Sequence, residues 1–308
     1  VPLRWTGYTG GGFSRISVNP SLSIIYKLNY AWRFTAHASY KERYGEMTDL
    51  YDRPYQTDYR NSVWNCGILP VYRQQLYSVY GEYKNTAREF FATVNLTHNR
   101  EWYNRIYEQR IENGQVQRVS LPLSNHGSGY TVKSTLSKGF YELGLKTSFL
   151  VLLNISKAEQ ISGGQRLPYQ YRLMRLEPKV IWTPNRHWET SYQTDIRYGG
   201  NKIGERTRLA PLWNVTQQVQ LSYIFSPIEA SLSVDHYHND VNEDQSVNAV
   251  FADFSVSWKS GRWQITTTAT NLFDKRTYAY TQYASLESYT SWVRIRPREF
   301  LVAIRYQL

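Results

Sequence analysis

The stretch Glu299-Phe-Leu-Val-Ala-Ile-Arg-Tyr-Gln-Leu308 decides the fold of this chain. Successive side chains of a β-strand point to opposite faces. One face of this stretch is therefore wholly apolar, and it carries Phe300, Val302, Ile304, Tyr306 and Leu308. The other face is mostly polar, so the strand needs an apolar environment on one side and a polar environment on the other.

The same alternation recurs along the chain, and no helical period competes with it over more than a turn or two. In the hairpin at residues 17–41, for example, Leu22, Ile24 and Phe34 share one face, whereas Arg33 and His37 share the other. The pattern predicts about 13 strands, near 17–28, 32–41, 74–84, 89–100, 129–138, 143–156, 169–182, 188–199, 212–225, 228–238, 246–259, 262–272 and 296–308.

The connections between these strands alternate between short and long. The short ones lie around 29–31, 85–88, 138–142, 183–187, 226–227 and 260–261. The long ones lie around 44–72, 101–128, 157–168, 200–211, 239–245 and 273–295. Outer-membrane barrels have short periplasmic turns and long extracellular loops. The chain is therefore predicted to be all-β, a transmembrane antiparallel β-barrel.

Composition alone favours a different interpretation, a large soluble all-β protein, because the mean hydropathy of the 308 residues is −0.57. Membrane barrels also average out as polar, however, and the 27 Tyr and 10 Trp suit aromatic girdles at two membrane interfaces. The net charge of +11 is spread along the chain without a nucleic-acid-binding motif. We therefore expect the positive charge to interact with anionic lipid or with an anionic cargo. We expect no nucleic-acid partner.

The run Asn271-Leu272-Phe273-Asp274-Lys275, followed by Arg296-Pro-Arg298 and the terminal strand, resembles the C-terminal end of TonB-dependent outer-membrane receptors, in a Bacteroidetes-like form. The resemblance places the run in the penultimate strand. It implies a twenty-two-stranded barrel with an N-terminal plug in the outer membrane of a Gram-negative bacterium. Such receptors import a scarce ligand, such as a siderophore, haem, a glycan or a peptide, with energy passed on by TonB.

The chain departs from this family in having no plug, only about 13 strands, and a terminal Leu where the family usually has Phe. We expect residues 1–308 to be a single domain, the C-terminal part of such a barrel, with residues 1–15 the remnant of an extracellular loop. Its expected partners are outer-membrane lipid and lipopolysaccharide, the rest of the barrel and plug, TonB through the plug, and a surface lipoprotein. By analogy with the family, the apolar face of the last strand is the signal read by the barrel-assembly machinery.

Aromatic side chains in the long loops are the candidate ligand-binding residues, because such rings stack on sugars and flat ligands. The candidates are Tyr59, Trp64, Tyr280, Tyr283 and Trp292. Self-packing of the long loops and aromatic girdles at the level of lipopolysaccharide are the alternative explanation, which the sequence favours. No carboxylate spacing implies acid–base catalysis, so no enzyme and no cofactor is predicted. Two imidazoles in His236-Tyr-His238 lack a third ligand nearby in the sequence, so no metal site is predicted.

Two other functions remain open from the sequence. The chain would be a complete passive porin of 14 strands if residues 101–128 held one more crossing. It could also be a structural barrel that has lost transport and serves a surface or assembly complex.

Overall fold

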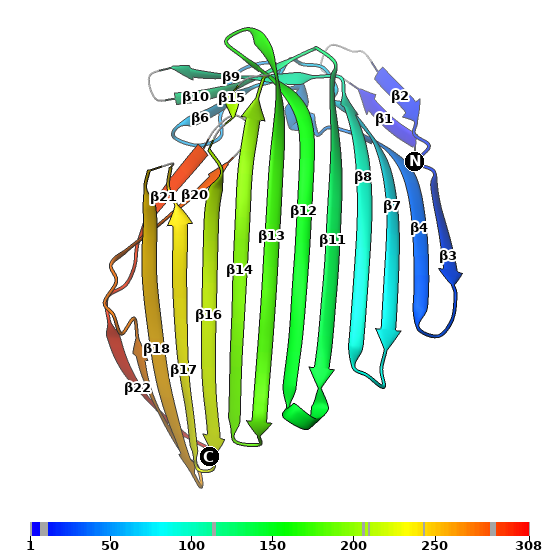
Figure 1. Cartoon of the computed structure of the whole chain (residues 1–308). Coiled ribbons are helices and arrows are strands. Elements are labelled where there is room, and N and C mark those ends of the chain that lie inside the picture. The colour runs from blue at the N-terminus through cyan, green and yellow to red at the C-terminus, as the bar shows by residue number, and fades with distance from the viewer. Residues whose placement is uncertain are drawn as a thin grey trace.

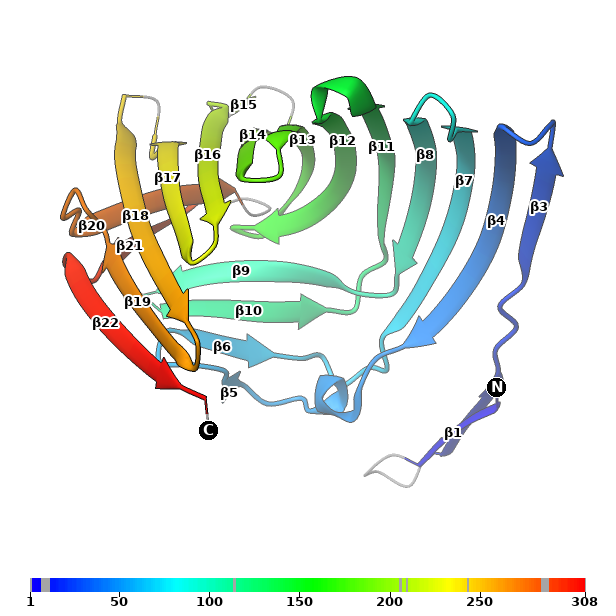
Figure 2. The ribbon, with the colours of Figure 1, turned by 90° about the horizontal axis from the view of Figure 1, so that it is seen from below.

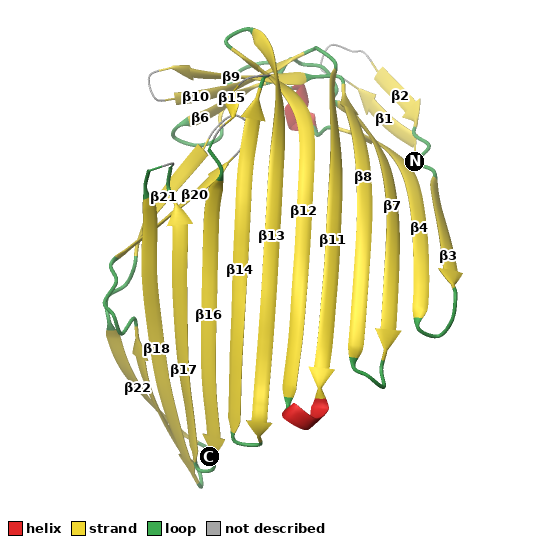
Figure 3. Cartoon of the chain, viewed as in Figure 1, coloured by secondary structure: helices red, strands yellow, loops and turns green. Residues whose placement is uncertain are grey.

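The computed structural model describes residues 2–6, 12–112, 115–204, 207–208, 210–242, 244–283 and 288–307. Within them the protein is all-β (Figure 3), apart from two short 3₁₀ helices at Met47–Leu50 and Tyr141–Leu143. No helix in the described part of the chain is both long and apolar enough to cross a membrane.

Thirteen long strands in the described ranges form one curved antiparallel wall (Figure 1). They are, in spatial order, β3 (Ser21–Lys27), β4 (Trp32–Tyr44), β7 (Val71–Asn85), β8 (Phe90–Tyr103), β11 (Asn125–Phe140), β12 (Leu145–Ser162), β13 (Gln165–Asn185), β14 (Trp188–Ile203), β16 (Leu212–Phe225), β17 (Ile228–Asp240), β18 (Ser246–Ser260), β19 (Trp263–Thr270) and β22 (Glu299–Tyr306). Each lies within a few residues of a predicted strand, so the predicted architecture is confirmed.

The convex face of the wall is apolar and the concave face is polar. In the register of β12 with β13, Val151 lies opposite Leu176, and Leu153 lies opposite Met174, all on the convex face. On the other face, Arg175 of β13 lies opposite Arg197 of β14. This arrangement follows from the period of two, which sends every second side chain of each strand to the same side.

Aromatic rings form two belts on the convex face. Near the short turns, the ring centroids of Trp188 and Tyr223 lie 4.7 Å apart. Toward the long loops, those of Tyr198 and Trp213 lie 4.8 Å apart. Ten residues of β14 separate Trp188 from Tyr198. At about 3.3 Å per residue and a tilt of about 40°, they span about 25 Å, the height of the apolar band of a membrane barrel.

Part of the long loops folds into a roof across the mouth of the wall (Figure 2). Its strands are β5 (Tyr55–Gln56), β6 (Asn61–Trp64), β9 (Ile106–Glu112) and β10 (Gln115–Leu121). β10 pairs with β6 and β9, and β9 pairs with the end of β12. Residues 101–128 therefore hold the β9–β10 hairpin as part of the roof. The described residues of this stretch make no fourteenth crossing, which removes the basis of the 14-strand porin.

The N-terminal stretch, which we expect to be the remnant of an extracellular loop, contains two short strands. β1 (Pro2–Thr6) and β2 (Gly12–Ile16) pair as a separate two-stranded ribbon.

The two lateral edges of the wall are β3 and β22. The strand order of the sheet makes them neighbours in a ring. Their hydrogen-bonded registers, however, join β3 to β4 and β22 to β19, and no register among the described residues joins them to each other. Every residue of both strands is exposed, and Figure 2 shows them well apart. Within the described residues, both edges are therefore unpaired.

Candidate ligand-binding site in the lumen

The hairpin of β20 (Thr277–Tyr283) and β21 (Ser288–Arg294) lies inside the curved wall (Figure 1). Asn239 of β17 is 2% exposed, and its Nδ2 donates a hydrogen bond to the carbonyl oxygen of Ala279 at 3.1 Å. The Thr281 hydroxyl donates to the carbonyl oxygen of Val241 at 3.1 Å. Ala279 is fully buried and Thr281 is 1% exposed. The hairpin is therefore docked against the wall, where it closes part of the lumen.

The family-like run Asn271–Lys275 forms the base of this hairpin. Asn271 Nδ2 donates to the carbonyl oxygens of Lys275 and Arg296, both at 2.8 Å, and its Oδ1 accepts from the Lys275 amide at 3.0 Å. Asp274 accepts a hydrogen bond from the Arg298 amide at 2.9 Å. The two ends of the hairpin are thus tied to each other through two side chains.

The strand that leads into this base ends earlier than predicted. We expected it to include Asn271 and Leu272, but β19 ends at Thr270. Asn271 and Asp274 have positive φ angles of 50° and 52°. Asn and Asp tolerate this left-handed conformation better than most residues, so the run is a turn and not the end of a strand. Phe273 is 56% exposed.

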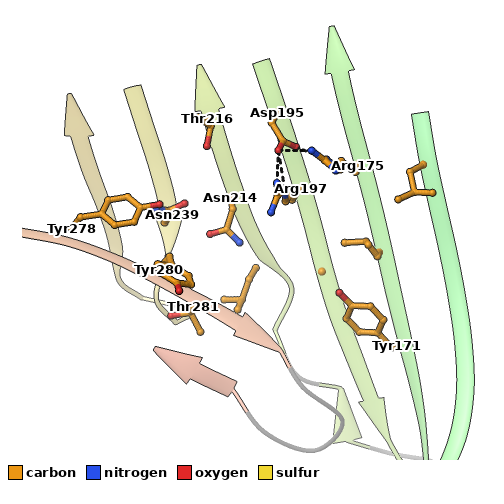
Figure 4. Close-up of a pocket in the computed structure, with 14 residues that line it drawn as sticks. Tyr171, Arg175, Asp195, Arg197, Asn214, Thr216, Asn239, Tyr278, Tyr280 and Thr281 are labelled. Atoms are coloured by element: carbon orange, nitrogen blue, oxygen red, sulfur yellow. Dashed lines mark hydrogen bonds and ion pairs between the residues drawn. The ribbon is translucent and has the colours of Figure 1, made fainter. Parts of the chain in front are cut away.

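A cavity of 590 Å³ lies between the hairpin and the concave face of β12–β17 (Figure 4). Its floor carries an arginine cluster. Arg175 donates from Nε and Nη2 to the two carboxylate oxygens of Asp195, at 3.0 and 3.1 Å, and also pairs with Glu177. Arg197 donates to the same Asp195, with Nη2 at 2.6 Å from Oδ2. The Arg197 side chain is 48% exposed, so it can still reach a ligand.

Uncharged polar and aromatic groups complete the lining. The Oδ1 atom of Asn214 is buried and has no hydrogen-bond partner among the described residues. A buried acceptor without a partner is costly. The Asn214 residue lines the cavity, although its Oδ1 atom is itself covered. Tyr171, Tyr278 and Tyr280 supply hydroxyl groups and ring faces. The guanidinium group of Arg197 and the tyrosine hydroxyl groups and rings together suit a polar ligand that carries hydroxyl or anionic groups.

A second lumen cavity of 810 Å³ lies under the roof. Glu101 in its wall accepts hydrogen bonds from Tyr103 at 2.8 Å and from Tyr72 and Gln74 at 3.0 Å. Tyr107 of β9 also lines this cavity, with the guanidinium groups of Arg118 and Arg105 3.7 Å and 5.0 Å from the centroid of its ring. Burial raises the pKa of the Tyr107 phenol above its ordinary value, against the opposing effect of the two cations.

Of the five predicted ligand-binding aromatics, the structure brings only Tyr280 into the cavity of Figure 4. Tyr59 is 80% exposed beside Arg60, and Trp64 in β6 donates its indole N–H to the Asp52 carbonyl oxygen at 2.8 Å. Trp292 of β21 is 68% exposed and does not line the cavity. The side chain of Tyr283 lies outside the described residues. Loop self-packing therefore accounts for Trp64.

The arginine cluster and Asn214 were not singled out as ligand contacts from the sequence. The alternation of the strands puts Arg175, Asp195 and Arg197 on the polar face of the wall, but any large barrel needs charged pairs on that face. The distinguishing signal is the proximity of the β20–β21 hairpin, which the sequence does not reveal.

The terminal strand has the predicted facing. Phe300, Val302, Ile304 and Tyr306 lie opposite convex-face residues of β19, and all four are exposed. Leu308 lies outside the described residues. His236 and His238 lie on the convex face in register with Gln217 and Val215. No group of three His, Cys, Asp or Glu side chains in the described part of the chain is placed to hold a metal ion.

No protein-family model matches the chain, and no curated relative matches it. Among solved structures, it is similar to FpvA of P. aeruginosa in complex with a heterologous pyoverdine and iron, with 10% identity over 93% of this chain and 44% of that chain, at a TM-score of 0.48. It is also similar to the ferric yersiniabactin uptake receptor FyuA from Yersinia pestis, with 8% identity over 94% of this chain and 50% of that one, also at 0.48.

A third similar structure is the toluene transporter TodX of Pseudomonas putida, with 11% identity over 86% of this chain and 78% of that chain, at a TM-score of 0.26. The chain spans about half the length of the two receptors. Identities of about a tenth carry no ligand or function over to this chain.

Proposed function

We propose that this chain forms part of an outer-membrane transport barrel that takes up a polar ligand through its lumen. The observation that carries the proposal is the cavity of Figure 4, which is lined by Arg197, Asn214 and tyrosines. It lies behind a wall whose convex face has an apolar band of membrane height between two aromatic belts. Binding and passage require no covalent chemistry, so the proposal includes no enzymatic step.

The wall favours a larger barrel of the TonB-dependent receptor type. In an antiparallel wall of thirteen strands, the first and the last strand run in the same direction, so β3 and β22 cannot pair antiparallel with each other. An odd number of further strands between them would restore antiparallel pairing at both edges. The transporters that the chain resembles have 22 strands. The difference from thirteen is nine strands, which is an odd number and meets this condition. A plug within that barrel would supply the contact with TonB.

The lining narrows the ligand class. Arg197 offers guanidinium N–H donors, and Asn214 contributes a polar side chain to the lining. Ferric siderophores, glycans, haem and peptides all present oxygen atoms that could accept from Arg197. Tyr171, Tyr278 and Tyr280 offer hydroxyl groups that donate or accept, and ring faces on which sugar rings stack. Glycans and peptides therefore fit the lining best, and a surface lipoprotein that presents such a ligand is a compatible partner.

Calorimetry on the purified protein, in detergent and with the rest of its barrel, tests the proposal. The probes are oligosaccharides, short peptides, haem and a ferric siderophore. We expect one class to bind, and we expect Arg197→Ala to weaken it about 10-fold or more, because a hydrogen bond to a charged group contributes about 1.5–3 kcal/mol. Arg186→Ala, in an exposed short turn, is the matched control. If Arg197→Ala binds the ligand with wild-type affinity, this cavity is not the binding site. A stable open pore in a planar bilayer would indicate passive diffusion instead.

A further inference from the structure

Four basic side chains lie together on the convex face of β8–β14, on the loop side of the apolar band. Arg100, Lys157 and Lys202 belong to one register row, in which they alternate with Ser128 and Gln170. Arg172 of β13 lies two residues nearer the band than Gln170. We call Arg100, Lys157, Arg172 and Lys202 the cationic row.

The spacing of the cationic row follows from strand geometry. Neighbouring strands lie about 4.8 Å apart. Two strand steps separate Arg100 from Lys157, and two more separate Lys157 from Lys202. Successive cations of the row are therefore about 10 Å apart, close enough for one ligand with two anionic groups to reach a pair of them.

A cleft of 290 Å³ opens on this surface between Lys157 and Lys202. His126, Ser128 and Gln170 also line it. Ammonium, hydroxyl and amide groups are hydrogen-bond donors, and several converge on one small cleft. Such a donor set suits a phosphate group.

The positive charge of the row is not neutralised within the described residues. No ion pair with a carboxylate there involves Lys157, Arg172 or Lys202. The acidic group that lines the cleft, Glu159, is already paired with Arg166 at 3.0 Å and lies 4.0 Å from His126. An anionic ligand would therefore meet uncompensated cations.

The depth of the row favours a lipid as the ligand. Arg172 lies two residues beyond Met174, the register partner of the upper-belt residue Tyr198. Immediately below the row, Tyr130 and Ile155 are 59% and 41% exposed on the same face. A molecule bound by the cations would place any acyl chains along these apolar side chains, and a free anion would leave that surface unused.

We propose that the cationic row and its cleft bind the phosphate groups of a phosphorylated glycolipid in the outer leaflet of the membrane. The inference rests on the proposed outer-membrane placement of the wall. The sugar-linked phosphates would lie between Lys157, Lys202 and Arg172, and the acyl chains would continue down the apolar band.

Native mass spectrometry of the detergent-solubilised protein tests the proposal. The probes are a bis-phosphorylated glucosamine-disaccharide lipid, the same lipid without its phosphates, and inorganic phosphate. We expect only the phosphorylated lipid to bind tightly. The triple variant Lys157→Gln, Arg172→Gln, Lys202→Gln should lose on the order of 100-fold in affinity, because each cation near a membrane surface contributes about fivefold.

A charge-matched control separates the row from net charge. Lys133→Gln, Lys146→Gln and Lys179→Gln remove three cations from the concave face and should change the affinity less than twofold. Equal binding of the two lipids, equal loss in both triple variants, or equally tight binding of inorganic phosphate would each overturn the proposal. Insertion of the wild type into vesicles is measured separately. Its failure would count against the membrane placement, whereas the measurement in detergent would still decide whether the row binds the phosphates.

Discussion

Replacing Asn271 with Gly should release the β20–β21 hairpin from the lumen. Asn271 is 6% exposed, and its side chain makes three hydrogen bonds that join the two ends of the hairpin through Lys275 and Arg296. Gly adopts the φ of 50° found here without strain. The substitution therefore removes the side-chain bonds and leaves the backbone conformation available.

The expected magnitude follows from the bonds that are lost. A hydrogen bond of this kind contributes about 1 kcal/mol net, within about 0.5–1.5. Three bonds give about 3 kcal/mol for the local opening of the hairpin. Because 1.4 kcal/mol corresponds to a factor of ten, the open population should rise about 100-fold. The wall should be little affected, since the thirteen-strand ladder does not include this side chain.

Hydrogen exchange followed by mass spectrometry measures this opening directly. Peptides that cover Thr277–Tyr283 and Ser288–Arg294 should exchange about 100-fold faster in Asn271→Gly, and peptides from β12 and β13 should not change. Asn29→Gly is the matched control, because Asn29 Oδ1 accepts hydrogen bonds from two amides, at 2.8 and 2.9 Å, in the turn between β3 and β4. It should accelerate exchange only in that turn.

The reasoning fails if the hairpin peptides of Asn271→Gly keep wild-type exchange rates. In that case the contacts of Asn239 and Thr281 with the hairpin would suffice to hold it. The reasoning also fails if exchange accelerates across the whole wall, because the run would then stabilise the sheet and not the hairpin.

Three further outcomes are expected. Val151→Arg on the convex face should lower the free energy of unfolding, measured by urea unfolding in lipid, by about 2–4 kcal/mol, because Val151 lies near the membrane midplane. Ser148→Arg on the concave face should lower it by less than about 1 kcal/mol. Equal losses in the two variants would mean that the assigned facing is wrong. Glu101→Ala leaves Tyr103 and the other donors to this carboxylate without an acceptor and should lower stability by about 3 kcal/mol or more, which the same unfolding curves would show or contradict. Because burial raises the pKa of Tyr107, the folded protein holds this proton more tightly than the unfolded chain. The contribution of this phenol to folding stability is complete below about pH 10 and is lost as the pH rises through the folded pKa. Between about pH 9 and pH 11, the unfolding temperature of Tyr107→Phe should therefore fall less than that of the wild type. Parallel curves of unfolding temperature against pH would contradict the prediction.

The sequence by itself determined the wall. Alternation in stretches such as Phe300–Tyr306 is a local property, because the side-chain period of two acts within a single strand. Short connections such as 226–227 force neighbouring strands to pair. Because short and long connections alternate along the chain, all the short ones lie at one end of the sheet and all the long ones at the other. The facing of Val151 and Arg175 could therefore be predicted without any knowledge of long-range contacts.

Only the tertiary structure decided where the long loops go. Nothing in residues 277–294 announces that the hairpin turns inward, and Asn239 meets the Ala279 carbonyl across 40 residues of sequence. The family-like run could be recognised in the sequence, but its role as a tie between 271–275 and 296–298 became visible only once both ends of the hairpin were in place. The cavity brings Arg197, Asn214 and Tyr280 together from three elements. Such convergence depends on register and loop packing, which are non-local, so a pattern with a period of two carries no information about it.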